Sequence, residues 1–182
     1  MEIRTSNETD KNDIEKIHIA AFGGGEKGQV IADLVKGLFD DETAMPLLSL
    51  VAVEGNRITG HVLFTKVTIA QSQKQVSAQI LAPLAVLPDV QKTGIGTRLI
   101  KEGLKQLQHS GVELVFVLGH PEYYPRCGFA PAGKLGFNAP YPVPEEHAAA
   151  WMVQEINGKV IGEVTGTVKC SRVLDQPEHW RE

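Results

Sequence analysis

Gln91–Gly96, with the sequence Gln-Lys-Thr-Gly-Ile-Gly, has the composition of a turn that binds an anion. It follows the apolar stretch Leu84–Leu87 and precedes an amphipathic segment, so we expect a strand, a short loop and a helix N-terminus in that order. The first N–H groups of a helix lack intrahelical partners, and the helix dipole adds partial positive charge there. Gly94 and Gly96 lack side chains, which lets backbone donors approach phosphate oxygens. The segment therefore predicts a phosphate site, beside which Lys92 adds positive charge.

Two better-known nucleotide motifs do not fit this turn. A Walker loop needs Gly-Lys-Ser/Thr at its second glycine, and here Gly96-Thr97-Arg98 stands instead. The dinucleotide fingerprint needs a third glycine where Leu99 stands, and it belongs near the first strand of an α/β fold. A purely structural turn stays open as an alternative, because short motifs recur by chance.

Cys127 is another residue whose type could do chemistry, since a thiol can carry an acyl group. No histidine and carboxylate stand near it in the pattern of an activated nucleophile. A buried cysteine that packs beside Phe129 is the favoured interpretation.

The elements that position the turn follow from apolar periodicity. Helices are expected at Thr9–Phe22, Lys27–Phe39 and Gly94–His109, and strands at Ile3–Arg4, Leu48–Glu54, Ile58–Ala70, Val76–Leu87, Val112–Leu118, Trp151–Ile156 and Val160–Val168. Thr9 or Asp10 is expected to cap the first helix. Glu54–Arg57 is typical of a hairpin turn. The helix from Gly94 lies between two apolar strands, which suggests a βαβ crossover.

The composition limits the classes of function. The chain has 182 residues, 42% of them hydrophobic and 22% charged, which favours one soluble domain over residues 1–182. The net charge of -4 without a basic block disfavours nucleic acid as a partner. No apolar run approaches the ~20 residues that span a bilayer, so no membrane partner is expected. The two cysteines suit a reducing compartment, and we expect a cytoplasmic protein without a metal site.

The turn and a second motif together resemble the GCN5-related N-acetyltransferase superfamily. Its signature, Gln/Arg-x-x-Gly-x-Gly/Ala between a strand and a helix, is met by Gln91–Gly96. Its second element, a tyrosine four residues before Gly-Phe, is met by Tyr124–Phe129. More narrowly, Ala82–Val86 with Leu118–Tyr124 resembles the bacterial YhbS-like N-acetyltransferases. The resemblance covers roughly Ile3 to Pro131 and implies an α/β fold with a mixed, mostly antiparallel sheet and helices on both faces.

The resemblance also implies a cofactor, acetyl-CoA, and residues that bind it. Backbone amides of the turn would bind the pyrophosphate, and the strand before it would pair with pantetheine. The cofactor-binding residues would be Leu84, Ala85, Val86, Gln91, Lys92, Thr93, Gly94, Ile95, Gly96 and Thr97. The Val86 N–H is the candidate donor to the tetrahedral oxyanion.

Tyr124 is the candidate general acid. A phenol with a pKa near ~10 is protonated at neutral pH and can protonate a thiolate of pKa about 8.5. Its neighbour Tyr123 is expected to be a packed aromatic with a hydrogen-bonded hydroxyl. The general base stays open: His120 is a candidate because an imidazole ordinarily titrates near ~6.5, and Glu122 and Glu26 are further candidates.

The acceptor would be a primary amine of a small molecule or peptide, acetylated directly in a ternary complex by a monomer or homodimer. Phe22–Gly28 and Ala130–Pro144 are expected to border it. The alternative is a non-catalytic acyl-CoA-binding or sensing domain, which would keep the turn without needing Tyr124.

Overall fold

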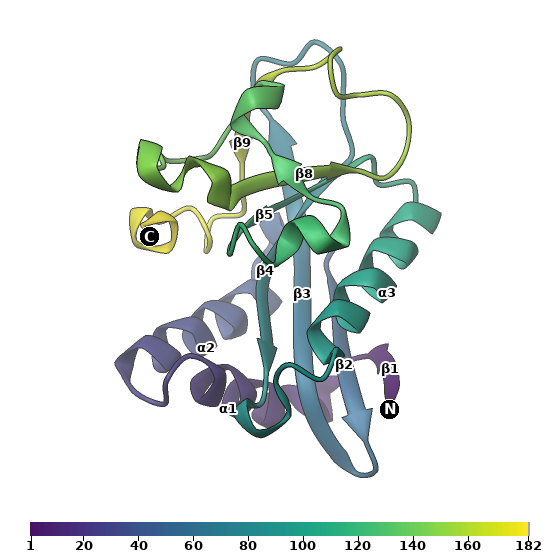
Figure 1. The fold of residues 1–182 in the computed structure, drawn as a ribbon, viewed down its shortest axis with the longest axis vertical. Coiled ribbons are helices and arrows are strands. Elements are labelled where there is room, and N and C mark those ends of the chain that lie inside the picture. Colours follow the sequence, from purple (N-terminus) through teal and green to yellow (C-terminus); the bar gives the residue numbers. More distant parts are fainter. Residues whose placement is uncertain (182) are drawn as a thin grey trace.

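Residues 1–181 are described by the computed structural model, and they form a nine-stranded sheet flanked by helices (Figure 1). The helices are α1 (Lys11–Ala21), α2 (Glu26–Phe39) and α3 (Ile95–His109). The strands are β1 (Glu2–Thr5), β2 (Leu48–Glu54), β3 (Arg57–Ile69), β4 (Ala78–Val86), β5 (Leu114–Leu118), β6 (Ala130–Pro131), β7 (Phe137–Asn138), β8 (Trp151–Glu155) and β9 (Gly166–Lys169).

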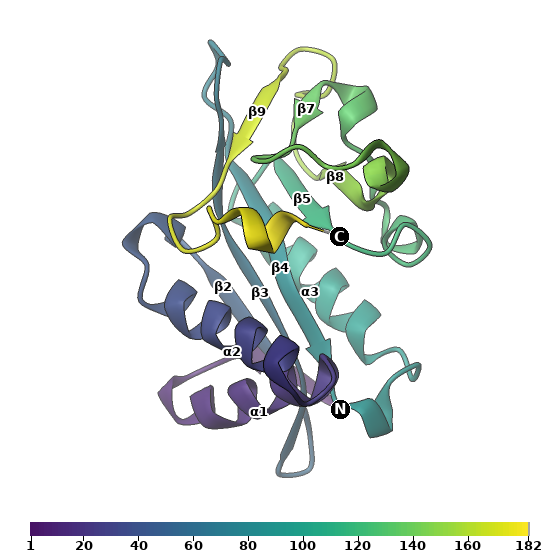
Figure 2. The same ribbon diagram turned by 90° about the vertical axis from the view of Figure 1, so that its left-hand side faces the viewer.

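The sheet is mixed and mostly antiparallel, as the sequence predicts. β1 to β4 pair antiparallel in chain order, and β5 joins β4 in parallel after the α3 crossover. β8 then pairs antiparallel with β5 and carries β6. β9 pairs antiparallel with the far end of β3, at Thr68 and Ile69, and carries the short β7. The C-terminal third therefore extends the sheet at two separate places (Figure 2).

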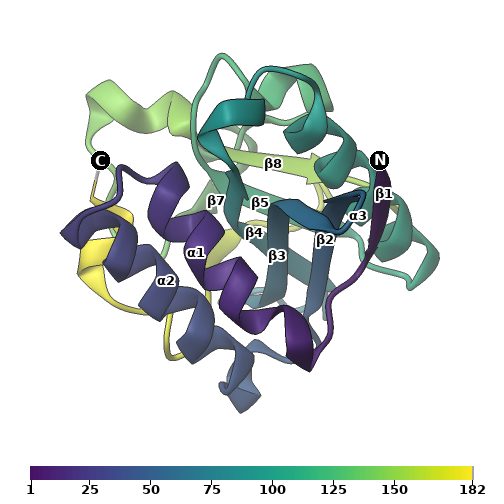
Figure 3. The ribbon, with the colours of Figure 1, turned by 90° about the horizontal axis from the view of Figure 1, so that it is seen from below.

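Helices cover both faces of the sheet, with α1 and α2 on one side and α3 on the other (Figure 3). The apolar stripe of α3 is buried at positions such as Leu99 and Ile100. Gly103 lets this helix approach the sheet closely, since a Cβ there would overlap the ring of Phe64. The N-terminus of α3 lies beside the end of β4, since a Cβ on Gly96 would lie 3.6 Å from the Leu84 side chain and 3.7 Å from that of Val86.

The gap between β4 and β5 is the part of the fold that matters for a ligand. β4 pairs with β5 only from Ala78 to Leu81. β4 then continues to Val86 with a bulge against β3, because Val62 lies opposite Leu84 whereas Phe64 lies opposite Leu81. Residues 84–86 thus form a strand edge beyond the last β5 pair, and the loop after this edge leads into α3.

One local prediction is confirmed in part and another is wrong. Asp10 is the N-cap residue of α1, as expected, but its side chain makes no capping hydrogen bond to that helix. The Asp10 carboxylate instead accepts from the Asn7 N–H at 2.8 Å, in the short 3-10 turn that Asn7 caps before α1, and is ion-paired with Arg4 at 2.7 Å. Residues 160–168 do not form one strand, because Gly162, with φ of 93°, turns the chain and β9 begins only at Gly166.

Candidate active site

The predicted turn leads into α3 with backbone conformations that glycine favours. Gly94 has φ of 93° and is the last residue before the helix, and Lys92 has φ of 64°. The first helical hydrogen bond runs from the Arg98 N–H to the Gly94 carbonyl at 3.0 Å. The N–H groups of Ile95, Gly96 and Thr97 therefore precede the hydrogen-bonded part of the helix. A Cβ on Gly94 would meet no atom within 4 Å, so open space lies over the turn.

Side chains of the turn bind its own backbone. The Gln91 amide donates to the Val86 carbonyl at 2.9 Å, and the Thr93 hydroxyl donates to the Val90 carbonyl at 2.6 Å. The Leu87 N–H donates to the Thr59 carbonyl of β3 at 2.9 Å. Because donors alternate along a strand, the Val86 N–H points away from β3, toward the side where β4 has left β5.

Tyr123 packs onto the first turn of α3. Its hydroxyl lies 3.2 Å from the Thr97 hydroxyl, and a Cβ on Gly96 would come within 2.7 Å of the same oxygen. The interpretation of Tyr123 as a packed aromatic with a hydrogen-bonded hydroxyl is confirmed. Its ring meets that of Tyr124 edge to face, with centroids 5.1 Å apart, so the two tyrosines link the turn to a cavity.

Tyr124 lies in the wall of that cavity. Its ring packs on Gly119, where a Cβ would overlap it, and meets Phe129 edge to face at 5.8 Å. The side chain is largely buried, and burial raises the pKa of its hydroxyl above the ordinary value. The phenol therefore keeps its proton at neutral pH. Cys127 is buried in the same apolar cluster as Phe129, in line with a packing role.

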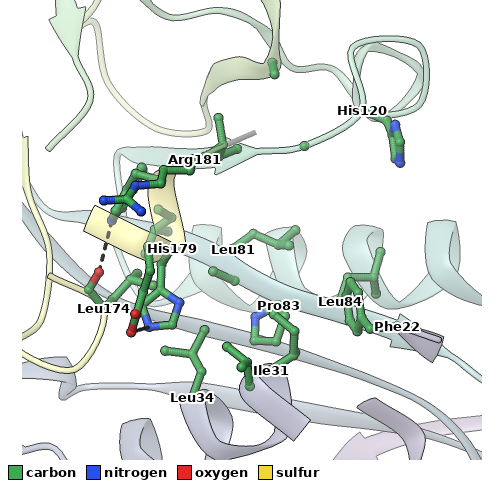
Figure 4. A pocket seen from close by; sticks show the side chains of 18 of the residues that line it. Phe22, Ile31, Leu34, Leu81, Pro83, Leu84, His120, Leu174, His179 and Arg181 are labelled. Atoms are coloured by element: carbon green, nitrogen blue, oxygen red, sulfur yellow. Dashed lines mark hydrogen bonds and ion pairs between the residues drawn. The ribbon is translucent and has the colours of Figure 1, made fainter. Parts of the chain in front are cut away.

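The cavity has a volume of about 550 Å³ and lies where β4 and β5 separate (Figure 4). Its walls come from five places: the α1–α2 loop with α2, the bulged part of β4, the loop after β5, the 3-10 turn Glu145–Ala150, and the C-terminal tail. The residues that these segments contribute include Phe22, Ile31, Leu34, Pro83, Leu84, Gly119, His120, Tyr124, Leu174 and His179.

Of the three general-base candidates, only His120 lines this cavity. His120 lines the cavity from the loop after β5. Glu122 lies instead beside a second hollow of about 330 Å³, next to Tyr123 and Arg126. Glu26 is the first residue of α2 and does not line the cavity, whereas its neighbour Lys27 does.

Residues 2–132 match the family model described as an acetyltransferase (GNAT) domain. The chain belongs to the GNAT family of acetyltransferases. Among curated GNAT relatives, it is 44% identical to the uncharacterized N-acetyltransferase YjhQ of Escherichia coli K12 over 167 residues, which cover 91% of this chain and 90% of that protein. It is also 28% identical to YhbS of Escherichia coli K12, over 93% of this chain and 95% of YhbS.

Solved GNAT structures share the fold at similar coverage. The crystal structure of Escherichia coli YhbS in complex with CoA has a TM-score of 0.84 at 26% identity, and covers 96% of this chain and 92% of that one. A GNAT acetyltransferase from Brucella melitensis in complex with acetyl-CoA has a TM-score of 0.75 at 28% identity, over 96% and 97% of the two chains. Fold class and enzyme class therefore agree with the sequence prediction.

The cavity is lined by one of the two segments that the sequence predicts to border an acceptor. Phe22 and Lys27 do line the cavity, as expected for the α1–α2 loop. Ala130–Pro144 does not, because Ala130 and Pro131 pair with β8 and Phe137 pairs with Gly166 of β9. These pairings hold the proline-rich stretch in the C-terminal part of the sheet.

The C-terminal tail takes the place predicted for that stretch. Its residues Leu174, Glu178, His179, Trp180 and Arg181 line the cavity. Trp151 and Trp180 are both buried, with ring centroids 5.7 Å apart. The presence of a large apolar side chain at position 180 was the sequence signal that this segment packs against the sheet. None of the helices within residues 1–181 combines the length and the apolar composition of a transmembrane segment.

Proposed function

We propose that this chain transfers the acetyl group of acetyl-CoA directly to a primary amine of a small molecule or peptide. One observation carries the proposal: the exposed edge of β4 joins the cavity that contains Tyr124 to the turn at the N-terminus of α3. A thioester laid along this edge would have its phosphates at one end and its acyl group at the other. The CoA and acetyl-CoA complexes of the YhbS and Brucella melitensis proteins support the cofactor.

The cofactor would be held mainly by backbone groups. The pyrophosphate would accept hydrogen bonds from amides of Gln91, Lys92, Thr93, Gly94, Ile95, Gly96 and Thr97. Pantetheine would pair with the strand formed by Leu84, Ala85 and Val86. The open space over Gly94 supports this placement, since an anion at a helix N-terminus needs room as well as donors. The Gln91 amide would have to release the Val86 carbonyl if pantetheine pairs there.

The acyl transfer would use the cavity end of the same edge. The Val86 N–H stays our candidate donor to the oxyanion, because it points away from β3. Tyr124 would protonate the departing thiolate, and the raised pKa of its hydroxyl supports the role of an acid that is protonated at neutral pH. His120, at the cavity wall, is the general-base candidate that the sequence supplied.

A screen of amines with free CoA as the readout tests the proposal. The panel should include small amines, aminoacyl compounds and peptide N-termini, each with acetyl-CoA and the purified chain. Release of CoA that depends on one class of amine is the expected result. Binding of acetyl-CoA without release in the presence of any amine would favour a sensing domain on the same fold, and absence of binding would contradict both.

A further inference from the structure

The C-terminal tail is held rigidly at the acceptor side of the cavity. Trp180 is buried, and its indole N–H donates to the Leu174 carbonyl at 3.0 Å. Its ring meets Trp151 of β8 edge to face. Residues 177–180 form a 3-10 turn that these contacts anchor, so the side chain before Trp180 has a fixed place.

That side chain is His179, and it extends into the cavity. Figure 4 shows its ring extending from the tail toward Leu34 of α2, whereas His120 comes from a separate loop. Only 11% of the His179 side chain is exposed, and its Nε2 lies 3.9 Å from a carboxylate oxygen of Glu178. Burial lowers the pKa of His179, so the imidazole is neutral at pH 7 and able to accept a proton.

The wall that faces the tail is apolar. Phe22 of the α1–α2 loop and Val30, Ile31 and Leu34 of α2 line it, and Leu174 adds to it from the tail. Besides Tyr124 and His179, the charged or titratable side chains around the same cavity are Lys27, His120, His147, Glu178 and Arg181. An apolar wall beside the His179 imidazole fits an amine carried on an apolar body better than a polyhydroxylated or polycationic one.

We propose that His179 is the general base of the reaction and that the acceptor is a primary amine on an apolar body. This inference rests on the proposed acetyl transfer. The amine nitrogen attacks the thioester carbon, forming the C–N bond as the C–S bond breaks. The nitrogen loses one proton to the His179 imidazole, and the thiolate gains one from Tyr124. His179 returns its proton to solvent and Tyr124 regains one, so amine and acetyl-CoA give amide and free CoA.

Turnover of 2-phenylethylamine, an amine with an apolar body, tests both parts. Wild-type protein should acetylate it with kcat/KM at least about tenfold above that for ethanolamine, because binding removes the aromatic body from water. In His179→Gln, kcat/KM for 2-phenylethylamine should fall about 100-fold or more, the usual contribution of a general base. The affinity for CoA, measured by calorimetry, should not change. The matched control is His109→Gln, at an exposed position at the end of α3, which should leave kcat/KM unchanged.

Chemical rescue separates a proton acceptor from a residue that only shapes the wall. His179→Ala leaves a space of imidazole size, and added imidazole should restore part of its activity while leaving the wild type unaffected. A chain that binds no CoA would contradict the proposed function itself. A chain that binds CoA but prefers ethanolamine, or acetylates neither amine, would overturn the acceptor class. Equal turnover by His179→Gln, or no rescue of His179→Ala, would overturn the role of His179.

Discussion

Nε2 of His18 lies 2.8 Å from Nδ1 of His61, in the interior between α1 and the sheet. Both side chains are fully buried, and the Ser49 hydroxyl lies 2.8 Å from the other nitrogen of His61. Burial lowers the pKa of His18 to about 4, and it lowers the pKa of His61 well below the ordinary value. His18 also lowers the pKa of His61, whereas Asp10, which is ion-paired with Arg4, raises it. The folded chain therefore holds two neutral imidazoles.

This pair predicts a loss of stability on mild acidification. The unfolded chain takes up protons on both histidines as the pH falls below about 6.5, while the folded chain takes up none until far lower pH. Stability is therefore fully present above the unfolded pKa and is lost as the pH falls toward about 4 for His18. Between pH 7 and pH 5, urea unfolding should show the free energy of unfolding decreasing by about 1.5–2 kcal/mol per histidine.

Two variants check the origin of that decrease. His18→Leu removes one of the two groups and should reduce the pH dependence by about half. His109→Gln changes an exposed histidine of α3 and should leave it as in the wild type. An unfolding free energy that stays flat between pH 7 and pH 5 would show that the pair is not held neutral.

The sequence predicted those parts of the site whose residues are neighbours along the chain. A strand, two glycines and an amphipathic stripe follow one another between Leu84 and His109. Because each of these elements depends mainly on residues close to it in the sequence, the turn and α3 were predicted correctly. The His18–His61 pair could not be predicted from the sequence, because the two residues are 43 positions apart and lie in a helix and a strand whose packing depends on the whole fold. The tail position was missed for the same reason, since it depends on Trp180 reaching Trp151.

Gly103 should be intolerant of even a methyl group. A Cβ there would overlap the Phe64 ring, which is fully buried and cannot move without disturbing β3. Gly103→Ala should lower the free energy of unfolding by about 1–3 kcal/mol, despite the better helix propensity of alanine. Gly25→Ala is the control, because a Cβ at Gly25 meets no atom within 4 Å and its φ of -118° suits alanine. Equal stability of both variants in urea would contradict the close packing of α3.

Tyr124→Phe tests the proposed acid without changing the shape of the cavity wall. Loss of the hydroxyl should lower the rate of thiol release about 100-fold or more, with acetyl-CoA affinity retained. Tyr141→Phe removes a hydroxyl outside the cavity, 3.4 Å from the Asp175 carbonyl, and serves as the matched control. Turnover by Tyr124→Phe at the wild-type rate would contradict the role of Tyr124 as general acid, but it would not contradict the proposed cofactor site.

The central claim is that the turn before α3 holds the pyrophosphate of CoA, and calorimetric titration of CoA into Gly94→Asp tests it most directly. The substitution places a negative charge in the open space over the helix N-terminus, and the affinity should fall about 100-fold, or about 2.7 kcal/mol. Gly111→Asp is the matched control, because Gly111 follows the other end of the same helix and has a similar φ, 92° compared with 93° for Gly94. A Cβ at either glycine would meet no atom within 4 Å. Retained affinity in Gly111→Asp with loss in Gly94→Asp is the predicted result. Equal CoA affinity in wild type and Gly94→Asp would place the site elsewhere and contradict the account.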